Sequence, residues 1–323
     1  MQTDETMKHI FTIFGLLLLL SALMVACGGG VDYDVDDDGI NAPGVADDDD
    51  DDDNDAGDDD IDDDDDTEPF NPETFGITFY NVGLGDAALV EMPGPYMMLI
   101  DGGETGQGEF TICPDLEARG IERIDILVMT HPDYDHCGGL PEVFDCAEVG
   151  EVWVNGQTLE IDAYYQFLAA VEAWGGTVTT KQKGDVDHLG DLTIATIHNL
   201  GGYEVFDDNN LVLALDNGQY RVLMSADINQ AAQQDLYDQF GAALDCDLIK
   251  IPAHGYGPHS VDFVNALNAA VGILSVGENT LGYPNEATVT AYENTGLTLY
   301  RTDVDGNIYV RFLDTEITVD TEL

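Results

Sequence analysis

Two imidazoles and two carboxylates lie within six residues of this sequence, in the segment Thr130-His131-Pro132-Asp133-Tyr134-Asp135-His136-Cys137-Gly138-Gly139. Imidazole and carboxylate side chains together suit zinc, manganese or iron. The segment follows the apolar run 124–129, which has the composition of a buried strand, and its two glycines allow a tight backbone turn. A solvated polar loop is the alternative. The spacing favours a metal site formed by His131, Asp133, Asp135 and His136.

The elements before and after this segment predict an α/β fold. Short alternating or apolar runs at 77–80, 87–91 and 97–101 predict a meander of strands. We expect further strands at 124–129, 151–154 and 177–180, with helices at 140–145 and 161–174. A second block predicts strands at 192–198, 211–215, 220–225, 248–251 and 271–275, helices at 230–240, 261–269 and 286–294, and a final hairpin of 298–302 with 308–312.

Two mixed β-blocks that each end in helices predict two sheets packed face to face with helices outside, a four-layer αββα sandwich. Asn217-Gly218, between the strands 211–215 and 220–225, favours a hairpin turn. A doubly wound dinucleotide-binding fold is the alternative. The sequence lacks the G-x-G-x-x-G motif that such a fold would need between a strand and a helix.

The H-x-D-x-D-H-x-G-G pattern resembles the metallo-β-lactamase superfamily, in a variant with Asp133 where many members carry His. Residues 76–313 also resemble the extracellular metallo-β-lactamase domain of ComEC competence proteins. The segments that carry this likeness are Asn81-Val82-Gly83-Leu84-Gly85-Asp86-Ala87, Leu99-Ile100-Asp101-Gly102-Gly103, Leu248-Ile249-Lys250-Ile251-Pro252-Ala253-His254-Gly255, Ser275-Val276-Gly277-Glu278-Asn279 and Tyr300-Arg301-Thr302-Asp303. The resemblance implies the metallo-β-lactamase fold.

The resemblance also implies a ligand set for one or two divalent ions, zinc first, with manganese or iron as alternatives. Its members are His131, Asp133, Asp135, His136, Asp227 and His254. Asp101 is expected to accept a hydrogen bond from a ligand imidazole. Asp207, Asp208 and Asn209 lie where the family has a polar segment that faces the site, and we expect Asn209 to contact substrate. Lys250 would steady an anionic substrate or, alternatively, form an ion pair with a nearby carboxylate.

These residues imply a metal-dependent hydrolase in which a metal-activated hydroxide attacks a phosphodiester or other small anionic ester. Asp135 would orient the hydroxide, and Asp133 would bind metal or move a proton. The first alternative is a lactam, lactone or thioester hydrolase of the same fold. The second is a catalytically weak, metal-binding envelope lipoprotein.

Four residues depart from the ComEC pattern. Asn81 replaces an Asp, Leu84 a Gln, Ala253 the first His of a His-His-Gly, and Tyr283 a His before Pro284. We expect all four near the mouth of the active site, where they put cleavage of DNA in doubt. His259 could supply the missing imidazole or lie at the surface.

The charge of the chain also argues against extended nucleic acid as a partner. The formal net charge is −56, and residues 69–323 hold 41 acidic and eight basic residues. Nucleic-acid binding usually draws its affinity from Lys and Arg that neutralise phosphates. We therefore expect a small anionic or ester substrate, a salt-adapted acidic surface and a monomer.

The N-terminal residues predict export and a lipid anchor. Residues 1–27 combine Lys8, a short apolar run at 10–20 and a segment ending Ala26-Cys27, which resembles a bacterial lipobox with Cys27 as the lipidated residue. A plain secretory signal is the alternative. The location expected is extracytoplasmic, on the bacterial membrane, with the outer membrane as one possibility.

Residues 28–68 are almost entirely Asp, Gly and other small residues, which predicts an Asp-rich disordered spacer before a hydrolase domain at 69–323. Asp34-Val35-Asp36-Asp37-Asp38-Gly39 matches the opening of a calcium loop, but Val45 stands where the closing Glu would fall. We therefore expect loose association of divalent ions with this stretch.

Four further cysteines, Cys113, Cys137, Cys146 and Cys246, allow three complete disulfide pairings in an oxidising compartment. Cys137 and Cys146 bracket a short predicted helix and are the first pair expected to form a bridge. Free, buried thiols are the alternative.

Overall fold

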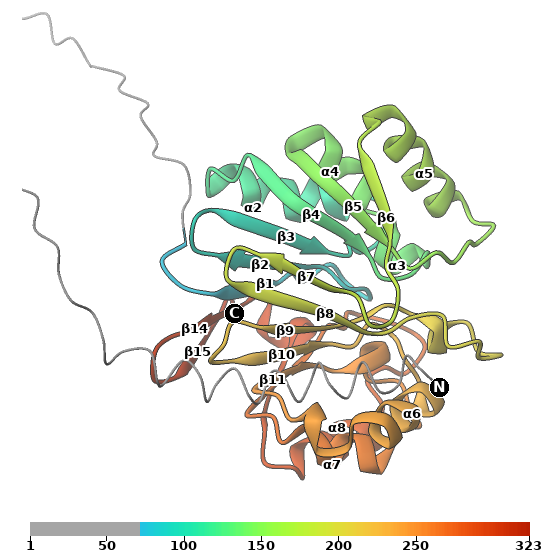
Figure 1. The fold of residues 1–323 in the computed structure, drawn as a ribbon, viewed down its shortest axis with the longest axis vertical. Coiled ribbons are helices and arrows are strands. Elements are labelled where there is room, and N and C mark those ends of the chain that lie inside the picture. The colour runs from blue at the N-terminus through green and yellow to red at the C-terminus, as the bar shows by residue number, and fades with distance from the viewer. Residues whose placement is uncertain (1–71) are drawn as a thin grey trace, which may run out of the picture. The chain divides into compact units, whose positions relative to one another are not determined.

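The strands of the chain form two sheets, as Figure 1 shows for the computed structural model, which describes residues 72–323. The eight-stranded sheet has the order β15 (Ile317–Thr321), β14 (Ile308–Phe312), β1 (Gly76–Phe79), β2 (Ala88–Met92), β3 (Tyr96–Ile100), β4 (Arg123–Met129), β5 (Glu148–Val154) and β6 (Thr177–Thr180). The seven-stranded sheet has the order β13 (Thr298–Arg301), β12 (Val271–Leu274), β11 (Leu248–Lys250), β10 (Arg221–Met224), β9 (Val212–Asp216), β8 (Leu192–His198) and β7 (Val186–Leu189).

The inner faces of the two sheets meet in one apolar core because side chains alternate along each strand. In β2, Val90 joins this central core, while its neighbour Leu89 joins the cluster under the outer helices. In β9, Leu213 faces the central core and Val212 faces outward. Both faces of these strands are buried, which explains their nearly continuous apolar sequences.

Helices cover the outer face of each sheet (Figure 1). The eight-stranded sheet is covered by α2 (Cys113–Ala118), α4 (Leu140–Cys146) and α5 (Asp162–Trp174), and the seven-stranded sheet by α6 (Gln230–Phe240), α7 (Val261–Leu267) and α8 (Glu286–Glu293). Short helical turns occupy the connections: η1 (Gly108–Ile112), α3 (Tyr134–Cys137), η2 (Asp207–Asn209), η3 (Gly241–Leu244), η4 (Pro252–Gly255) and α9 (Thr302–Asp305). This is the four-layer αββα sandwich predicted from the sequence.

Most of the predicted elements agree with the observed ones to within three residues at each end. The predicted meander is the antiparallel set β1, β2 and β3. The predicted hairpin of β9 and β10 is also antiparallel, and Gly218 in its turn has a φ of 87°, which glycine adopts without strain. No helix within residues 72–323 is long and apolar enough to cross a membrane.

The predicted C-terminal hairpin is wrong. β13 pairs in parallel with β12, whereas β14 pairs with β1 and β15 in the other sheet. The helical turn α9 carries the chain across, and its buried Thr302 bonds both the N–H and the carbonyl of Val276. The sequence prediction also missed the edge strands β7 and β15.

The cysteine prediction is wrong as well. Cys113 and Cys146 form the disulfide, across a sequence separation of 33 residues, and it joins α2 to the end of α4. Cys137 and Cys246 are free and buried. The side chain of Cys137 lies in the apolar cluster under the helices, where its thiol donates to Pro132 O.

Several predictions lie outside the described residues. These are the leader 1–27 with the lipidated Cys27, the spacer 28–68 and the calcium-like segment 34–39. Residues 72–323, nearly all of the predicted hydrolase domain 69–323, belong to one compact unit.

Candidate metal centre

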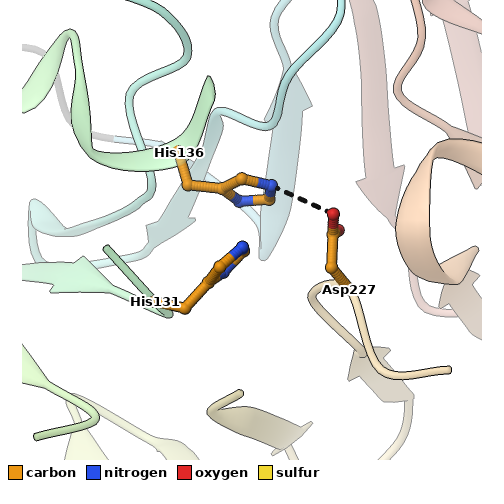
Figure 2. Close-up of side chains that lie close together, drawn as sticks. All are labelled: His131, His136 and Asp227. Atoms are coloured by element: carbon orange, nitrogen blue, oxygen red, sulfur yellow. Dashed lines mark ion pairs between the residues drawn. The ribbon is translucent and has the colours of Figure 1, made fainter. Parts of the chain in front are cut away.

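Three imidazoles and one carboxylate converge where strands of both sheets end. His131 and His136 follow β4, Asp227 follows β10, and His254 follows β11. Figure 2 shows the rings of His131 and His136 beside the Asp227 carboxylate. One ligand atom from each of these three residues lies within 4.8 Å of the other two, and the same holds for Asp135, His136 and His254.

The six residues expected to bind metal therefore lie together. The shortest distances join His254 Nε2 to Asp227 Oδ2 at 3.2 Å and His136 Nε2 to Asp227 Oδ2 at 3.4 Å. His254 Nε2 lies 3.4 Å from Asp135 Oδ2, and His131 Nε2 lies 3.5 Å from Asp133 Oδ2. Asp227 thus lies between the imidazoles of His136 and His254.

The hydrogen bonds of the three imidazoles aim their Nε2 atoms at the centre. His254 Nδ1 donates to the carbonyl of Ser275 at 2.9 Å, and His136 Nδ1 donates to Asp101 Oδ2 at 2.9 Å. His131 Nδ1 lies 3.0 Å from Thr130 Oγ1, whose own proton goes to Asp101 Oδ2 at 2.6 Å. Each ring therefore carries its proton on Nδ1 and presents the Nε2 lone pair to the centre.

These three Nε2 atoms are buried and form no well-aligned hydrogen bond among the described residues, and each faces a carboxylate oxygen 3.2–3.5 Å away. Buried polar atoms without partners are costly, and an ion that accepts their lone pairs would remove that cost. Imidazole nitrogen and carboxylate oxygen are zinc, manganese or iron ligands. The residues present therefore fit one or two divalent ions.

Asp101 occupies the supporting position that the resemblance implied. Its side chain is 1% exposed and accepts from three donors: Thr130 N at 2.8 Å, Thr130 Oγ1 at 2.6 Å and His136 Nδ1 at 2.9 Å. One carboxylate thereby fixes two neighbouring ligand imidazoles, one of them directly and the other through the threonine hydroxyl.

The backbone around the centre is held in rare conformations. Asp101, Ala226 and His254 have φ values of 59°, 46° and 50°, in the left-handed region that costs non-glycine residues about 1–3 kcal/mol each. A Cβ on Gly139 would collide with the Gly102 carbonyl oxygen, so the turn after the first ligand cluster requires glycine. Tertiary packing maintains this geometry.

Without a cation, the carboxylates and imidazoles shift one another's pKa. Burial lowers the pKa of His254, but the Asp227 charge and the nearby Asp135 carboxylate outweigh it and raise the pKa to about 10. Burial also lowers the pKa of His136. The charges of Asp227 and Asp101 outweigh burial and raise this pKa well above its ordinary value. The charges of His254, His136 and Lys250 overcome burial and hold the pKa of Asp227 well below its usual range. A proton and a metal ion therefore compete for these sites.

The sequence prediction assigned no role to Asp86 and left that of Asp207 open. Asp86 is buried, lies 3.7 Å from His254 Nδ1 and 3.8 Å from His136 Nδ1, and forms an ion pair with Lys250. Asp207 offers an oxygen within 4.8 Å of ligand atoms of His131 and Asp133. Burial, followed by the Asp227 charge, raises the pKa of Asp207 to about 6. Asp86 lies inside a segment that carried the family resemblance, and that position was the one sequence signal that could have assigned it to the site.

The structure contradicts both predicted substrate contacts. Lys250 is 2% exposed, pairs with Asp86, lies 3.5 Å from Asp227 Oδ1 and donates to Ala226 O, so the ion-pair alternative is correct. Asn209 uses its whole amide within its own loop. Its Oδ1 accepts from the N–H groups of residues 202 and 203, and its Nδ2 donates to the carbonyls of residues 203 and 205. Asp208 accepts from Asn229 N at the start of α6.

The four departures from the ComEC pattern do not share one location. Leu84 is buried in the apolar cluster under α6, α7 and α8, and Asn81 is exposed, with its N–H donated to Asn307 Oδ1. Ala253 is buried next to His254. Tyr283 is partly exposed, and its ring lies against that of Tyr256, which follows His254 by two residues. The structure thus places Ala253 and Tyr283 near His254, and the expectation for Asn81 and Leu84 stays a prediction.

His259 does not supply the missing imidazole. Its ring lies against Tyr292, with the ring centroids 6.4 Å apart. Tyr292 belongs to the buried cluster under α8, away from the metal ligands.

Comparisons with known proteins agree with this geometry. Residues 80–256 match the family model described as Metallo-beta-lactamase superfamily. ComE operon protein 3 of Bacillus subtilis (strain 168) is 24% identical over 255 residues, which cover 73% of this chain and 33% of that protein. Competence protein ComA of Neisseria gonorrhoeae is 25% identical over 234 residues, which cover 71% of this chain and 31% of that protein. The chain thus spans about a third of the length of these relatives.

Among solved structures, CmlA, a diiron beta-hydroxylase from Streptomyces venezuelae, is similar with a TM-score of 0.50. The identity is 16%, and the match covers 75% of this chain and 55% of that one. At this identity the likeness shows the fold alone. The family match and the curated relatives confirm the resemblance predicted from the motifs.

Proposed function

The chain belongs to the metallo-beta-lactamase superfamily, and from that premise we propose that it is a metal-dependent hydrolase of phosphodiester or other small anionic ester bonds. One observation carries the proposal. Three buried imidazoles, His131, His136 and His254, direct their Nε2 atoms toward the carboxylates of Asp133 and Asp227, which lie 3.2–3.5 Å away. An ion bound between them would accept the imidazole lone pairs and offset the charge of the carboxylates.

The candidate ligands divide between two neighbouring sets. His131, Asp133 and Asp207 form one set, and Asp135, His136 and His254 form the other. Asp227 lies beside both. When bound, divalent ions would lower the pKa of water and stabilise the negative charge that develops on the substrate oxygen.

Two of these candidate ligands, Asp135 and Asp133, can also act on the water and its proton. Asp135 is largely buried and lies beside His254, so it can orient an attacking water by accepting its hydrogen bond. The side chain of Asp133 is 31% exposed, so it can pass a proton to solvent. Asp101 takes no part in the reaction and holds the imidazoles in place.

The experiment begins with metal analysis of the purified full chain. Hydrolysis of bis-nitrophenyl phosphate and of nitrocefin is then measured for the wild type and for Asp135→Ala. The matched control is Asp262→Ala, which removes an exposed carboxylate from the first turn of α7. We expect the phosphodiester to be cleaved, with a loss of about 100-fold or more in Asp135→Ala and little change in the control.

Each result separates the proposal from its rivals. Cleavage of nitrocefin in preference to the phosphodiester would favour the lactam, lactone or thioester hydrolase. Stoichiometric bound metal with no turnover of either compound would favour a metal-binding envelope protein. A chain that binds no metal would overturn the metal-centre assignment itself.

We also propose that the chain acts outside the cytoplasm, anchored to the bacterial membrane through a lipid on Cys27, as a monomer. The lipobox-like residues 23–27 support this location. The Cys113–Cys146 bridge supports it too, because disulfides persist in oxidising compartments. Fractionation of cells that express the wild type or Cys27→Ser tests the anchor. The wild type should sediment with membranes and Cys27→Ser should not, and the same distribution for both proteins would refute the anchor.

A further inference from the structure

Three partly exposed tyrosines lie beside candidate metal ligands in the chain or in space, and their side of the centre is called its opening below. Tyr134 precedes Asp135 in the chain and is 49% exposed, and Tyr256 follows His254 by two residues and is 48% exposed. The ring of Tyr283 lies against that of Tyr256, with the ring centroids 5.3 Å apart.

The segment of Tyr283 lies beside that of His254, because Asn285 N donates to the Gly255 carbonyl at 2.9 Å. Burial, then the charge of Asp135, raises the pKa of Tyr134. Burial raises the pKa of Tyr283 as well, followed by Tyr256, Asp227 and Asp135. The Asp135 charge thus acts on both phenols, and the backbone contact together with the ring contact places the Tyr256–Tyr283 pair beside the segment of His254.

The loop that carries Tyr283 is held in a fixed conformation by Asn279. Its Oδ1 accepts from the N–H groups of Leu281, Gly282 and Tyr283 at 3.0–3.1 Å. Its Nδ2 donates to the carbonyls of Gly277 and Tyr283 at 2.9 Å. A ring positioned in this way loses little conformational freedom when it binds a ligand.

The basic residues of the domain are committed elsewhere. Seven of the eight Lys and Arg residues in 72–323 form ion pairs with carboxylates: Arg119, Arg123, Lys181, Arg221, Lys250, Arg301 and Arg311. The eighth, Lys183, lines a different pocket with His198 and Tyr203. The described residues therefore give an anionic substrate no arginine clamp at this opening.

The centre itself has an excess of negative charge. Six carboxylates and the Lys250 ammonium would leave a net charge of about −1 even with two divalent ions bound. The carboxylates counted are Asp86, Asp101, Asp133, Asp135, Asp207 and Asp227. A substrate that carries negative charge alone would gain little from the field at this opening.

We propose that the substrate of this centre carries an alkylammonium group beside its anionic ester, and that the Tyr256–Tyr283 pair binds that group. The inference rests on the proposed hydrolase function and narrows its substrate class to zwitterionic esters. Tyrosine ring faces attract cations, and the carboxylates behind them add to the attraction. The ester oxygen can then face the imidazoles while the ammonium stays at the tyrosines.

The test compares two esters that differ in one atom. The first is p-nitrophenyl phosphocholine, and the second is p-nitrophenyl 3,3-dimethylbutyl phosphate, in which carbon replaces the charged nitrogen. With the metal-loaded full chain, we expect kcat/KM to favour the choline ester by about tenfold or more. The double variant Tyr256→Leu/Tyr283→Leu should bring this ratio close to one. Tyr165→Leu, at an exposed tyrosine of α5, should keep it.

The outcomes separate the two proposals. Equal or lower kcat/KM for the choline ester overturns the inference and leaves the hydrolase function standing. If neither ester is cleaved, calorimetric titration with phosphocholine and 3,3-dimethylbutyl phosphate decides the inference alone. Tighter binding of phosphocholine that disappears in the double variant supports it, whereas equal binding, or none, overturns it.

Discussion

Asp101 is the residue on which the orientation of two candidate ligands depends. Its two oxygens accept three hydrogen bonds, from Thr130 N, Thr130 Oγ1 and His136 Nδ1. An amide at this position cannot accept them all, because its NH₂ group would face a donor in either orientation. The carboxylate therefore cannot be replaced by its nearest isostere without disturbing His136 and, through Thr130, His131.

We accordingly predict that Asp101→Asn weakens metal binding by about 10- to 100-fold. Competition with a chromophoric chelator measures the affinity. Asp115→Asn is the matched control, because Asp115 also accepts from a buried tyrosine and an arginine but lies on α2. Unchanged affinity in Asp101→Asn, or an equal loss in the control, would contradict the supporting role of Asp101.

At the scale of residues, the sequence predicted those site residues that are adjacent in the chain or that lie in a family motif. The ligands in 131–136 are adjacent in the chain, and Asp227 and His254 were placed by resemblance. Asp86, in contrast, joins the centre through contacts with residues more than 45 positions away. The predicted substrate contact of Lys250 failed for the same reason. Its partner Asp86 is distant in the chain and is brought to it by the packing of the two sheets.

At the scale of elements, the Cys113–Cys146 bridge ties the start of α2 to the end of α4, the helix that follows the ligand-bearing turn. Closing a loop of this length restricts the unfolded chain and is worth about 3–4 kcal/mol. We predict that Cys113→Ala/Cys146→Ala lowers the free energy of unfolding by about that amount, measured by urea denaturation.

The control for this prediction is Cys246→Ala, which removes one methyl-sized group from a free, buried thiol. Its cost should be smaller, about 1 kcal/mol. Peptide mapping of the oxidised protein should recover Cys113 joined to Cys146. Recovery of a Cys137–Cys146 peptide instead would reject the observed pairing.

His198, at the end of β8, gives a prediction about pH. Burial lowers its pKa by more than the hydrogen bond from Nε2 to the Asp208 carbonyl, at 2.8 Å, raises it, so the fold favours the neutral imidazole. Because the folded pKa lies below the unfolded value of about 6.5, the unfolded chain takes up the proton first as pH falls. The stability contributed by His198 is therefore complete above about pH 6.5 and declines below it.

The measurement compares urea unfolding of the wild type and His198→Gln between about pH 7.5 and pH 5. The stability advantage of the wild type should shrink as the pH falls. His188→Gln, at an exposed imidazole of β7, should show a difference that does not depend on pH in this way. A wild-type advantage that grows in acid would show that His198 is protonated in the fold.

The elements that the sequence predicted well are the central ones. Strands such as β4 and β8 are buried on both faces, so their apolar runs are long and unambiguous. Edge strands bury less, and β15 alternates polar with apolar residues at half-exposed positions, so its pattern is weak. The partners of β13 and β14 depend on which sheet each strand joins, and local sequence does not encode that choice.

At the scale of the whole molecule, two sheets place ligands from β4, β10 and β11 at one end of the sandwich. Parallel pairing of β10, β11 and β12 brings their carboxyl ends to the same edge. The αββα architecture therefore explains why residues as distant as His131 and His254 meet. It also concentrates carboxylates in one place, which adds to the charge imbalance of the domain.

That imbalance leads to a prediction about salt. Residues 69–323 hold 41 acidic residues against eight basic ones, and seven of those bases are already paired. The remaining carboxylates repel one another in the compact state.

Raising NaCl from about 10 mM to about 1 M shortens the screening length from about 30 Å to about 3 Å. This removes most of the repulsion between carboxylates, and it weakens only exposed ion pairs, which contribute little to stability. We therefore predict that the metal-loaded protein unfolds at a higher temperature in high salt, by roughly 2–4 °C for each kcal/mol gained. KCl at the same ionic strength should have the same effect, because screening does not depend on the identity of the cation. An unfolding temperature that stays constant or falls with salt would mean that ion pairs outweigh self-repulsion in this domain.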